Sequence, residues 1–174
     1  MKLPLPSLLI TAAALLLGAL AAPARADILY VSSYTSHAIE KFTSSGGVSI
    51  FASSGSRSPY GLAFDFAGNL YAANFGAGID KFTPGGVRSV FASSGLNGAF
   101  GLAFDSAGNL YAANFGDSTI VKFTPGGGGS VFASTGLSNP RYLAFTDDAG
   151  VPLNSLLNYL KMPHPKVAKV AKSL

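Results

Sequence analysis

The sequence predicts an all-β fold in which a unit of four antiparallel strands recurs along the chain. The first observation is a sixteen-residue block that occurs twice, as GLAFDFAGNLYAANFG at 61–76 and GLAFDSAGNLYAANFG at 101–116. The second is that these segments are apolar on both faces, so sheets must stack on sheets. The third is the turn chemistry between them, which is rich in Gly, Asn and Pro. Together they predict β-propeller blades; the alternative, a β-solenoid, has shorter coils without tight hairpins.

The first 26 residues are set aside before the fold is considered. Residues 8–22 form an apolar run of fifteen, LLITAAALLLGALAA, preceded by Lys2 and followed by Ala-Arg-Ala at 24–26. This pattern predicts a secretory signal peptide over 1–26, because the run is too short to span a membrane. We expect a mature chain from Asp27 that is periplasmic, cell-surface or secreted. An uncleaved anchor is the alternative.

The propeller segment is expected over 27–146. An incomplete first unit at 28–53 supplies three strands, and two complete units follow at 60–93 and 100–134. A lone innermost strand is then expected at Tyr142–Thr146, where it could complete the first unit. The strands expected in the first complete unit are Leu62–Asp65, Leu70–Phe75, Ile79–Pro84 and Val87–Ser93.

The turns between the first two strands of each complete unit carry an aspartate before a Gly-Asn pair. Asp65 and Asp105 are therefore predicted to hold these turns with their side chains, as aspartate commonly does. A calcium site at either residue is the alternative, although a single carboxylate binds calcium weakly.

Three units are few for a closed ring, since propellers typically have four to eight blades. Three arrangements therefore remain open. Two chains could form a homodimer that closes a six-bladed ring, the chain could be an open arc, or it could be a truncated fragment with exposed strand edges.

The composition of the chain limits which reactions and which partners are expected. The chain contains no cysteine, so no disulfide or thiol chemistry is expected. Residues 27–160 carry six basic and eight acidic side chains, which argues against nucleic acid as a partner. The segment 147–174 is basic and is expected to be a short helix or disordered. Weak contact of this tail with an anionic envelope surface is a further expectation.

The blocks GLAFDSAGNLYAAN, IVKFTPGG and SVFAS resemble the NHL-type repeat of six-bladed propellers, and the wider gluconolactonase-like and streptogramin-lyase-like propellers. The resemblance covers about residues 28–146. A lactonase-like enzyme implies a divalent metal held partly by an Asn that Tyr60 and Phe100 replace here. A lyase-like enzyme implies histidines, and the mature chain has only His37 and His164, both outside the blade motif. The enzyme interpretations are therefore disfavoured, and neither catalytic residues, a metal nor a cofactor is expected.

The resemblance also implies that ligands bind at one rim of the ring, which the residues at the ends of the two inner strands would form. Aromatic rings and amides there suit a protein, peptide or glycan ligand. The alternative is that the rings pack between blades and the amides hold loops. We expect an exported, non-enzymatic binding module. A lactonase- or lyase-like enzyme completed by a partner chain, or a truncated product without independent function, remains open. The candidate ligand-binding residues are Tyr60, Asn74, Phe75, Phe100, Asn114, Phe115 and Arg141.

Overall fold

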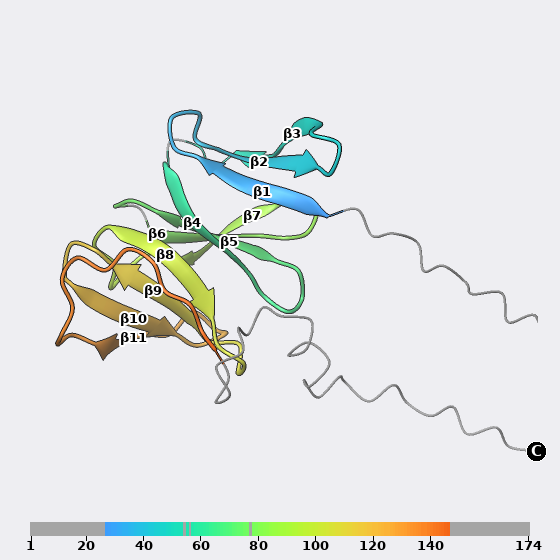
Figure 1. Ribbon diagram of the computed structural model, residues 1–174. Helices are drawn as coiled ribbons and strands as arrows, with labels where there is room; N and C mark the ends of the chain where they lie inside the picture. The colour runs from blue at the N-terminus through green and yellow to red at the C-terminus, as the bar shows by residue number, and fades with distance from the viewer. Residues whose placement is uncertain (1–26, 54, 56, 77, 147–174) are drawn as a thin grey trace, which may run out of the picture.

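The computed structural model describes residues 27–53, 55, 57–76 and 78–146, so the predicted signal peptide and basic tail lie outside the described residues. The described part is all-β and forms three antiparallel sheets (Figure 1). No helix in this part is long and apolar enough to cross a membrane. The strands are β1 Ile28–Ser33, β2 Ala38–Thr43, β3 Val48–Ser53, β4 Pro59–Phe64, β5 Leu70–Asn74, β6 Gly78–Phe82, β7 Arg88–Ala92, β8 Ala99–Phe104, β9 Leu110–Asn114, β10 Thr119–Phe123 and β11 Gly129–Ala133.

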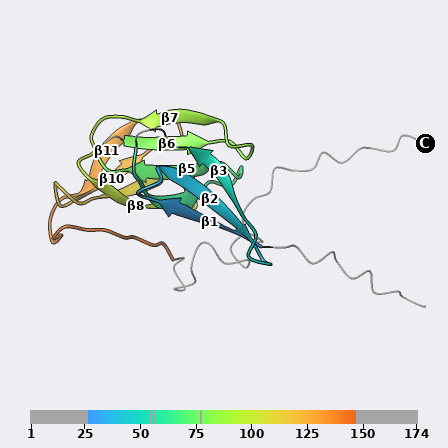
Figure 2. The ribbon, with the colours of Figure 1, turned by 90° about the horizontal axis from the view of Figure 1, so that it is seen from above.

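The predicted blade is confirmed in the second and third sheets. These sheets have the orders β4-β5-β6-β7 and β8-β9-β10-β11, and the first has only β1-β2-β3. Seen from above, β7, β6 and β5 follow one another from the outer edge of the molecule inward (Figure 2). The chain therefore builds an arc of stacked sheets with its innermost strands, β4 and β8, facing the centre.

The registers of the sheets repeat along with the sequence. Leu62 pairs with Ala72 and Leu102 with Ala112, so the identical blocks make identical ladders. Each sheet also carries one irregularity where its last two strands pair, directly after the isoleucine at Ile39, Ile79 or Ile120. A bulge in the same place in each unit indicates a built-in feature of the repeat, because bulges increase the local twist of a strand.

The core lies between the sheets, as the apolar faces predicted. Ala72 and Ala112 have no exposed surface, which allows neighbouring sheets to approach closely. A phenylalanine of β3 and one of β7 each reach across to the next sheet: the Phe51 ring lies 6.3 Å from Phe82, and the Phe91 ring 6.0 Å from Phe123. Each blade is thus buried mainly by its neighbours.

Two glycines set the spacing of the innermost strands. A Cβ on Gly61 would lie against the backbone of Phe100 and Gly101, closer than real atoms approach. A Cβ on Gly101 would meet Arg141 and Tyr142 in the same way, its Cβ falling 2.5 Å from the Arg141 carbonyl oxygen. Only glycine permits this close approach.

The turns are held as predicted. The Asp65 carboxylate accepts hydrogen bonds from the backbone of Ala67 at 3.0 Å and of Asn69 at 2.8 Å. Asp105 does the same with Ala107 at 2.9 Å and Asn109 at 2.8 Å. Both carboxylates therefore serve as turn caps.

The expected innermost strand at Tyr142–Thr146 is wrong in its extent. Residues 141–145 are irregular, and only Thr146 makes a β-bridge. Nor does this segment complete the first sheet, which has three strands among the described residues. The segment instead lies against Gly101 of β8. The physical reason is that a strand needs a neighbour, and the described residues offer no second strand on its outer side.

Candidate functional site

One rim of the arc carries a continuous row of aromatic rings. It is formed where the innermost strands begin and where the second strands of the sheets end. The Tyr60 ring lies 5.3 Å from Tyr34 and 4.5 Å from Phe100, and Phe100 lies 5.2 Å from Phe115. Phe75 packs between them, 5.8 Å from Tyr60 and 5.7 Å from Phe100. These spacings are those of edge and tilted aromatic contacts. We call these five rings and Arg141 the aromatic rim.

Arg141 ends the aromatic rim on one side. Its guanidinium lies 5.5 Å from the centre of the Phe100 ring and 5.1 Å from that of Phe115. Such distances allow cation–π attraction. Arg141 is exposed, and Tyr34 and Phe75 are about half exposed, so the rim presents both aromatic surface and a positive charge to solvent.

Tyr60 remains a neutral phenol at physiological pH. Burial raises its pKa above the ordinary value of 10.0, and the neighbouring Tyr34 raises it further, while Arg141 acts in the opposite direction. The Tyr60 hydroxyl can therefore donate or accept a hydrogen bond but cannot act as a base near neutral pH.

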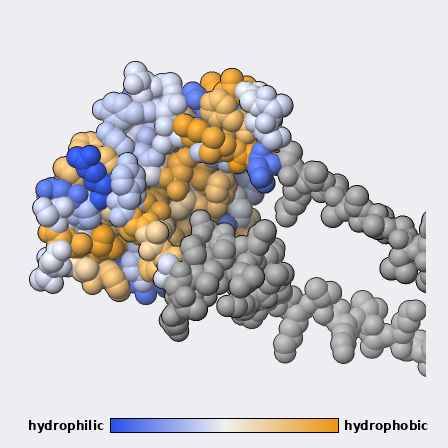
Figure 3. Space-filling model, viewed as in Figure 1, coloured by the Kyte–Doolittle hydropathy of each residue, from blue (hydrophilic) through white to orange (hydrophobic). Residues whose placement is uncertain are grey.

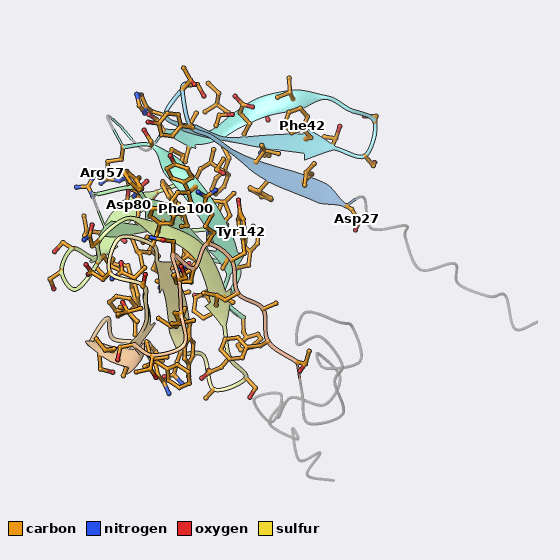
Figure 4. The ribbon with its side chains drawn as sticks, turned by 60° about the vertical axis from the view of Figure 1, so that its left-hand side comes forward. Asp27, Phe42, Arg57, Asp80, Phe100 and Tyr142 are labelled. Atoms are coloured by element: carbon orange, nitrogen blue, oxygen red, sulfur yellow. The ribbon has the colours of Figure 1, made fainter. Side chains whose placement is uncertain are left out.

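The two predicted asparagines lie beneath the aromatic rim and are fully buried. The Asn74 amide donates to Asp80 at 2.9 Å, and Asp80 is held by the Arg88 guanidinium at 2.8 and 3.0 Å. Arg57 approaches the same carboxylate at 3.8 Å. Figure 4 shows Arg57, Asp80 and Phe100 close together at this end of the molecule. The Asn74 Oδ1 atom is buried and has no hydrogen-bond partner among the described residues.

The equivalent Asn114 makes different contacts. Its Oδ1 accepts from the Asn97 backbone at 2.6 Å, and its amide donates to Asp117 and Thr119, both at 3.2 Å. Asp117 also accepts from the Asn97 side chain at 2.7 Å. The amide of Asn114 therefore ties two loops together, a structural role that the sequence analysis gave as its alternative.

The aromatic rim also contains Tyr34, whose position in the repeat matches Phe75 and Phe115. The Asp80–Arg88 ion pair was not predicted, because the two residues are separated by a turn and meet only across strands β6 and β7. No group of three His, Cys, Asp or Glu side chains in the described ranges has the arrangement of a metal site.

A hollow lies inside the arc, beside the innermost strands. Its volume is about 360 Å³, and it is bordered by β1, β4, β8 and the 142–143 segment. Hydrophobic side chains gather along this inner surface (Figure 3). The hollow is open rather than enclosed.

Comparison with known proteins assigns the fold. No protein-family model matches the chain, and no curated protein matches its sequence. Among solved structures, a virginiamycin B lyase from Staphylococcus aureus matches with a TM-score of 0.58 and 17% identity over 67% of this chain and 42% of that one. A structure titled streptogramin B lyase matches with 0.55 and 16%, over 64% and 42%. A gluconolactonase from Xanthomonas campestris matches with 0.53 and 20%, over 65% and 39%.

These likenesses establish that the described part of the chain has the fold of part of a β-propeller. The chain spans about two fifths of the length of each of these structures. At such low identities the agreement concerns the fold, since one fold supports many activities.

Proposed function

We propose that this chain is an exported, non-enzymatic binding module whose aromatic rim contacts a peptide or glycan. The observation that carries the proposal is the unbroken row from Tyr34 to Arg141, with rings 4.5–5.8 Å apart and a guanidinium at its end. Flat aromatic faces stack well on sugar rings and on aromatic or proline side chains, and the cation adds attraction for polar groups.

The carboxylates near the aromatic rim support binding over catalysis. Asp80 is held by Arg88, and Asp117 by Asn97 and Asn114, so both negative charges are already used in structural contacts. A general acid or base needs a group that is free to exchange a proton with a substrate. The second candidate is a lyase- or lactonase-like enzyme completed by a partner chain, and it is favoured by the likeness in fold to a streptogramin B lyase and a gluconolactonase.

The binding proposal is tested with defined probes. The purified chain is applied to a glycan array and to a random peptide library, and each ligand found is titrated by tyrosine fluorescence, since the chain has no tryptophan. Phe75→Ala removes a half-exposed ring of the rim and should weaken binding roughly tenfold or more. The matched control is Phe66→Ala, which removes an equally exposed ring from a turn at the opposite end of the strands.

Two outcomes would contradict the proposal. One is a ligand whose affinity changes equally in the Phe75→Ala and Phe66→Ala variants. The other is turnover: the chain is incubated with quinupristin, the compound bound in a virginiamycin B lyase structure, and with gluconolactone. Repeated conversion of either compound would favour the enzyme alternative.

Export is tested separately by intact-mass analysis of the extracytoplasmic fraction. The expected N-terminus is Asp27, because the Ala-Arg-Ala sequence before it places small residues at a cleavage site. Ala26→Asp should block processing and leave the longer chain. A wild-type protein that keeps Met1 would contradict export by this route.

A further inference from the structure

The two ends of the arc carry complementary unfinished sheets. At one end, β1 is the edge of its sheet and has a neighbour only on the β2 side among the described residues. In the other sheets the corresponding strands, β5 and β9, lie between two neighbours. At the other end, residues 141–145 lie along β8 without a sheet of their own. An unpaired strand edge is a template for pairing with another strand.

The exposure of Leu29 shows that β1 lacks a neighbouring strand among the described residues. Leu29 of β1 corresponds to Leu70 of β5 and Leu110 of β9 in the repeat. Leu70 and Leu110 have no exposed surface, whereas Leu29 is 63% exposed. Leu70 and Leu110 each pair with an innermost strand, at Phe64 and Phe104, and each packs against the preceding sheet. Leu29 has neither neighbour among the described residues.

The outer part of the last sheet also lacks a neighbour, because no further sheet follows it in the described chain. Phe132 of β11 corresponds to Phe51 and Phe91, which reach across to Phe82 and Phe123 of the following sheet. Phe132 has no following sheet in the described chain and is 62% exposed. The phenylalanine of the first sheet that corresponds to Phe82 and Phe123 is Phe42.

The 141–145 segment already occupies the place of a fourth innermost strand. Phe145 packs on Tyr111 with 4.8 Å between ring centres, as Phe104 packs on Tyr71 at 5.0 Å. Its sequence Leu-Ala-Phe at 143–145 repeats that of β4 and β8. The segment therefore has the composition and the packing of an innermost strand, but lacks the strand with which it would pair.

We propose that a second copy of this chain supplies the missing neighbour at each end. The 143–145 segment of one copy pairs with β1 of the other in the register of the complete sheets. That register places Leu143 opposite Val31, Ala144 opposite Tyr30 and Phe145 opposite Leu29. Phe132 then packs against Phe42 of the second copy, and the reciprocal contacts are identical by two-fold symmetry.

Two such arcs have the right size to close a ring. The described part of each copy has three sheets, so the pair has six, within the usual range for propellers. Each copy matches about two fifths of the solved propellers, so two copies correspond to about four fifths of one. Closure also extends the aromatic rim, because Arg141 comes beside Tyr34 of the second copy.

The chain's own 143–145 segment is a poorer occupant of the β1 edge. Residues 141 and 142 before it lie against Gly101, and its Phe145 packs on Tyr111, contacts that would be lost if the segment moved to its own β1. One residue departs from the repeat at the new junction: Tyr142 stands where Gly61 and Gly101 allow close approach. The innermost strands must therefore lie farther apart there than elsewhere in the ring.

The first test is the mass of the purified chain in solution, measured by light scattering across a dilution series. We expect twice the mass of one chain. Leu29→Asp and Phe132→Asp place a charge in the proposed contacts and should each weaken dimerisation roughly a hundredfold or more. Ile50→Asp is the matched control, because Ile50 is 72% exposed and the equivalent Val90 and Val131 are exposed as well.

Tyr142→Gly restores the residue of the complete repeats and should tighten the dimer. Circular dichroism checks that each variant remains folded. A folded wild-type monomer at all concentrations, or equal weakening by Leu29→Asp and Ile50→Asp, would overturn the proposal.

The second test determines both the register in which residues 143–145 pair with β1 and which copy of the chain supplies them. The chain has no cysteine, so Val31→Cys and Leu143→Cys introduce the only thiols. Paired strand positions bring Cα atoms within disulfide range. Oxidation of an equimolar mixture of the two single variants should give a covalent dimer that contains one of each. In the double variant, a disulfide within one chain would show that the chain closes on itself and would overturn the proposal, as would the absence of any cross-link.

Discussion

Strand β1 of the first sheet and strand β5 of the second occupy the same position in the repeat, yet they differ in how much of each is buried. Both contain a Leu-Tyr pair, at Leu29 and Tyr30 in β1 and at Leu70 and Tyr71 in β5. Leu70 is completely buried and Leu29 largely exposed. The second sheet has β4 on one side and sheets on both faces, whereas the first has neither an innermost strand nor a preceding sheet among the described residues. In this arc, burial depends on the neighbouring sheets.

The second and third sheets differ in a complementary way. Their strand sequences are almost the same, but Asp80 in the second corresponds to Val121 in the third. Both are buried. Arg88 neutralises Asp80, and its own pKa is raised by that hydrogen-bonded contact. The repeat thus tolerates either an ion pair or an aliphatic side chain at one buried position, provided that the charge is paired.

The comparison of β1 with β5 is tested most strongly by removing the same side chain from each. Leu70→Ala should lower the free energy of unfolding by about 2–5 kcal/mol, because it leaves a cavity between sheets. Leu29→Ala should change it by less than about 0.5 kcal/mol, because the side chain is already exposed. Urea titration measures both values, on the Phe132→Asp background so that any dimer contact is absent. Equal losses would mean that β1 is covered in solution by a segment outside the described residues.

The closeness of the stacked sheets is tested by enlarging a small side chain. Ala112→Leu should cost about 1–3 kcal/mol, because Ala112 has no exposed surface and lies in the core between sheets. Ala107→Leu is the control, in an exposed turn of the same sheet, and should change stability by less than about 0.5 kcal/mol. The first sheet carries the larger Val31 at the position of Ala112, in a strand that is less covered. A denaturation midpoint unchanged by Ala112→Leu would contradict close stacking.

The smallest expected effect on stability concerns the Asp105 turn, a kind of turn that only the two complete sheets contain. Burial alone would raise the pKa of Asp105, but hydrogen bonds from Asn109, Tyr111 and the Ala107 backbone outweigh it and hold the pKa below its ordinary value of 3.8. The ionised carboxylate therefore stabilises the fold above that value, and this contribution is lost as the pH falls through the lowered pKa.

Asp105→Asn should consequently be less stable than the wild type at pH 6, and the difference should shrink below pH 3.8. Urea midpoints of both proteins between pH 6 and pH 2.5 measure this. A difference that stays constant over the whole range would show that the charge of Asp105 does not contribute.

Much of the fold could be predicted from the sequence, because the same pattern of strands and turns recurs in all three sheets. The identical blocks around Leu70 and Leu110 determined the strands, and the apolar alternation on both faces determined that sheets stack. The Asp65 and Asp105 turns were also predictable, since an aspartate before Gly-Asn is a local signal. These features depend on residues close together in the chain, where backbone preference and side-chain pattern decide the outcome.

The tertiary structure alone decided the features that join distant segments. The rim itself was expected, but only the structure showed which of its rings touch and that Arg141 lies over Phe100. The structure also paired Asp80 with Arg88. It placed residues 141 and 142 against β8 and left the first sheet without a fourth strand among the described residues. The repeated sequence determines the strands and turns within each sheet, because those contacts are local. It does not determine which distant segments pack against one another, because their surfaces meet only after the chain has folded.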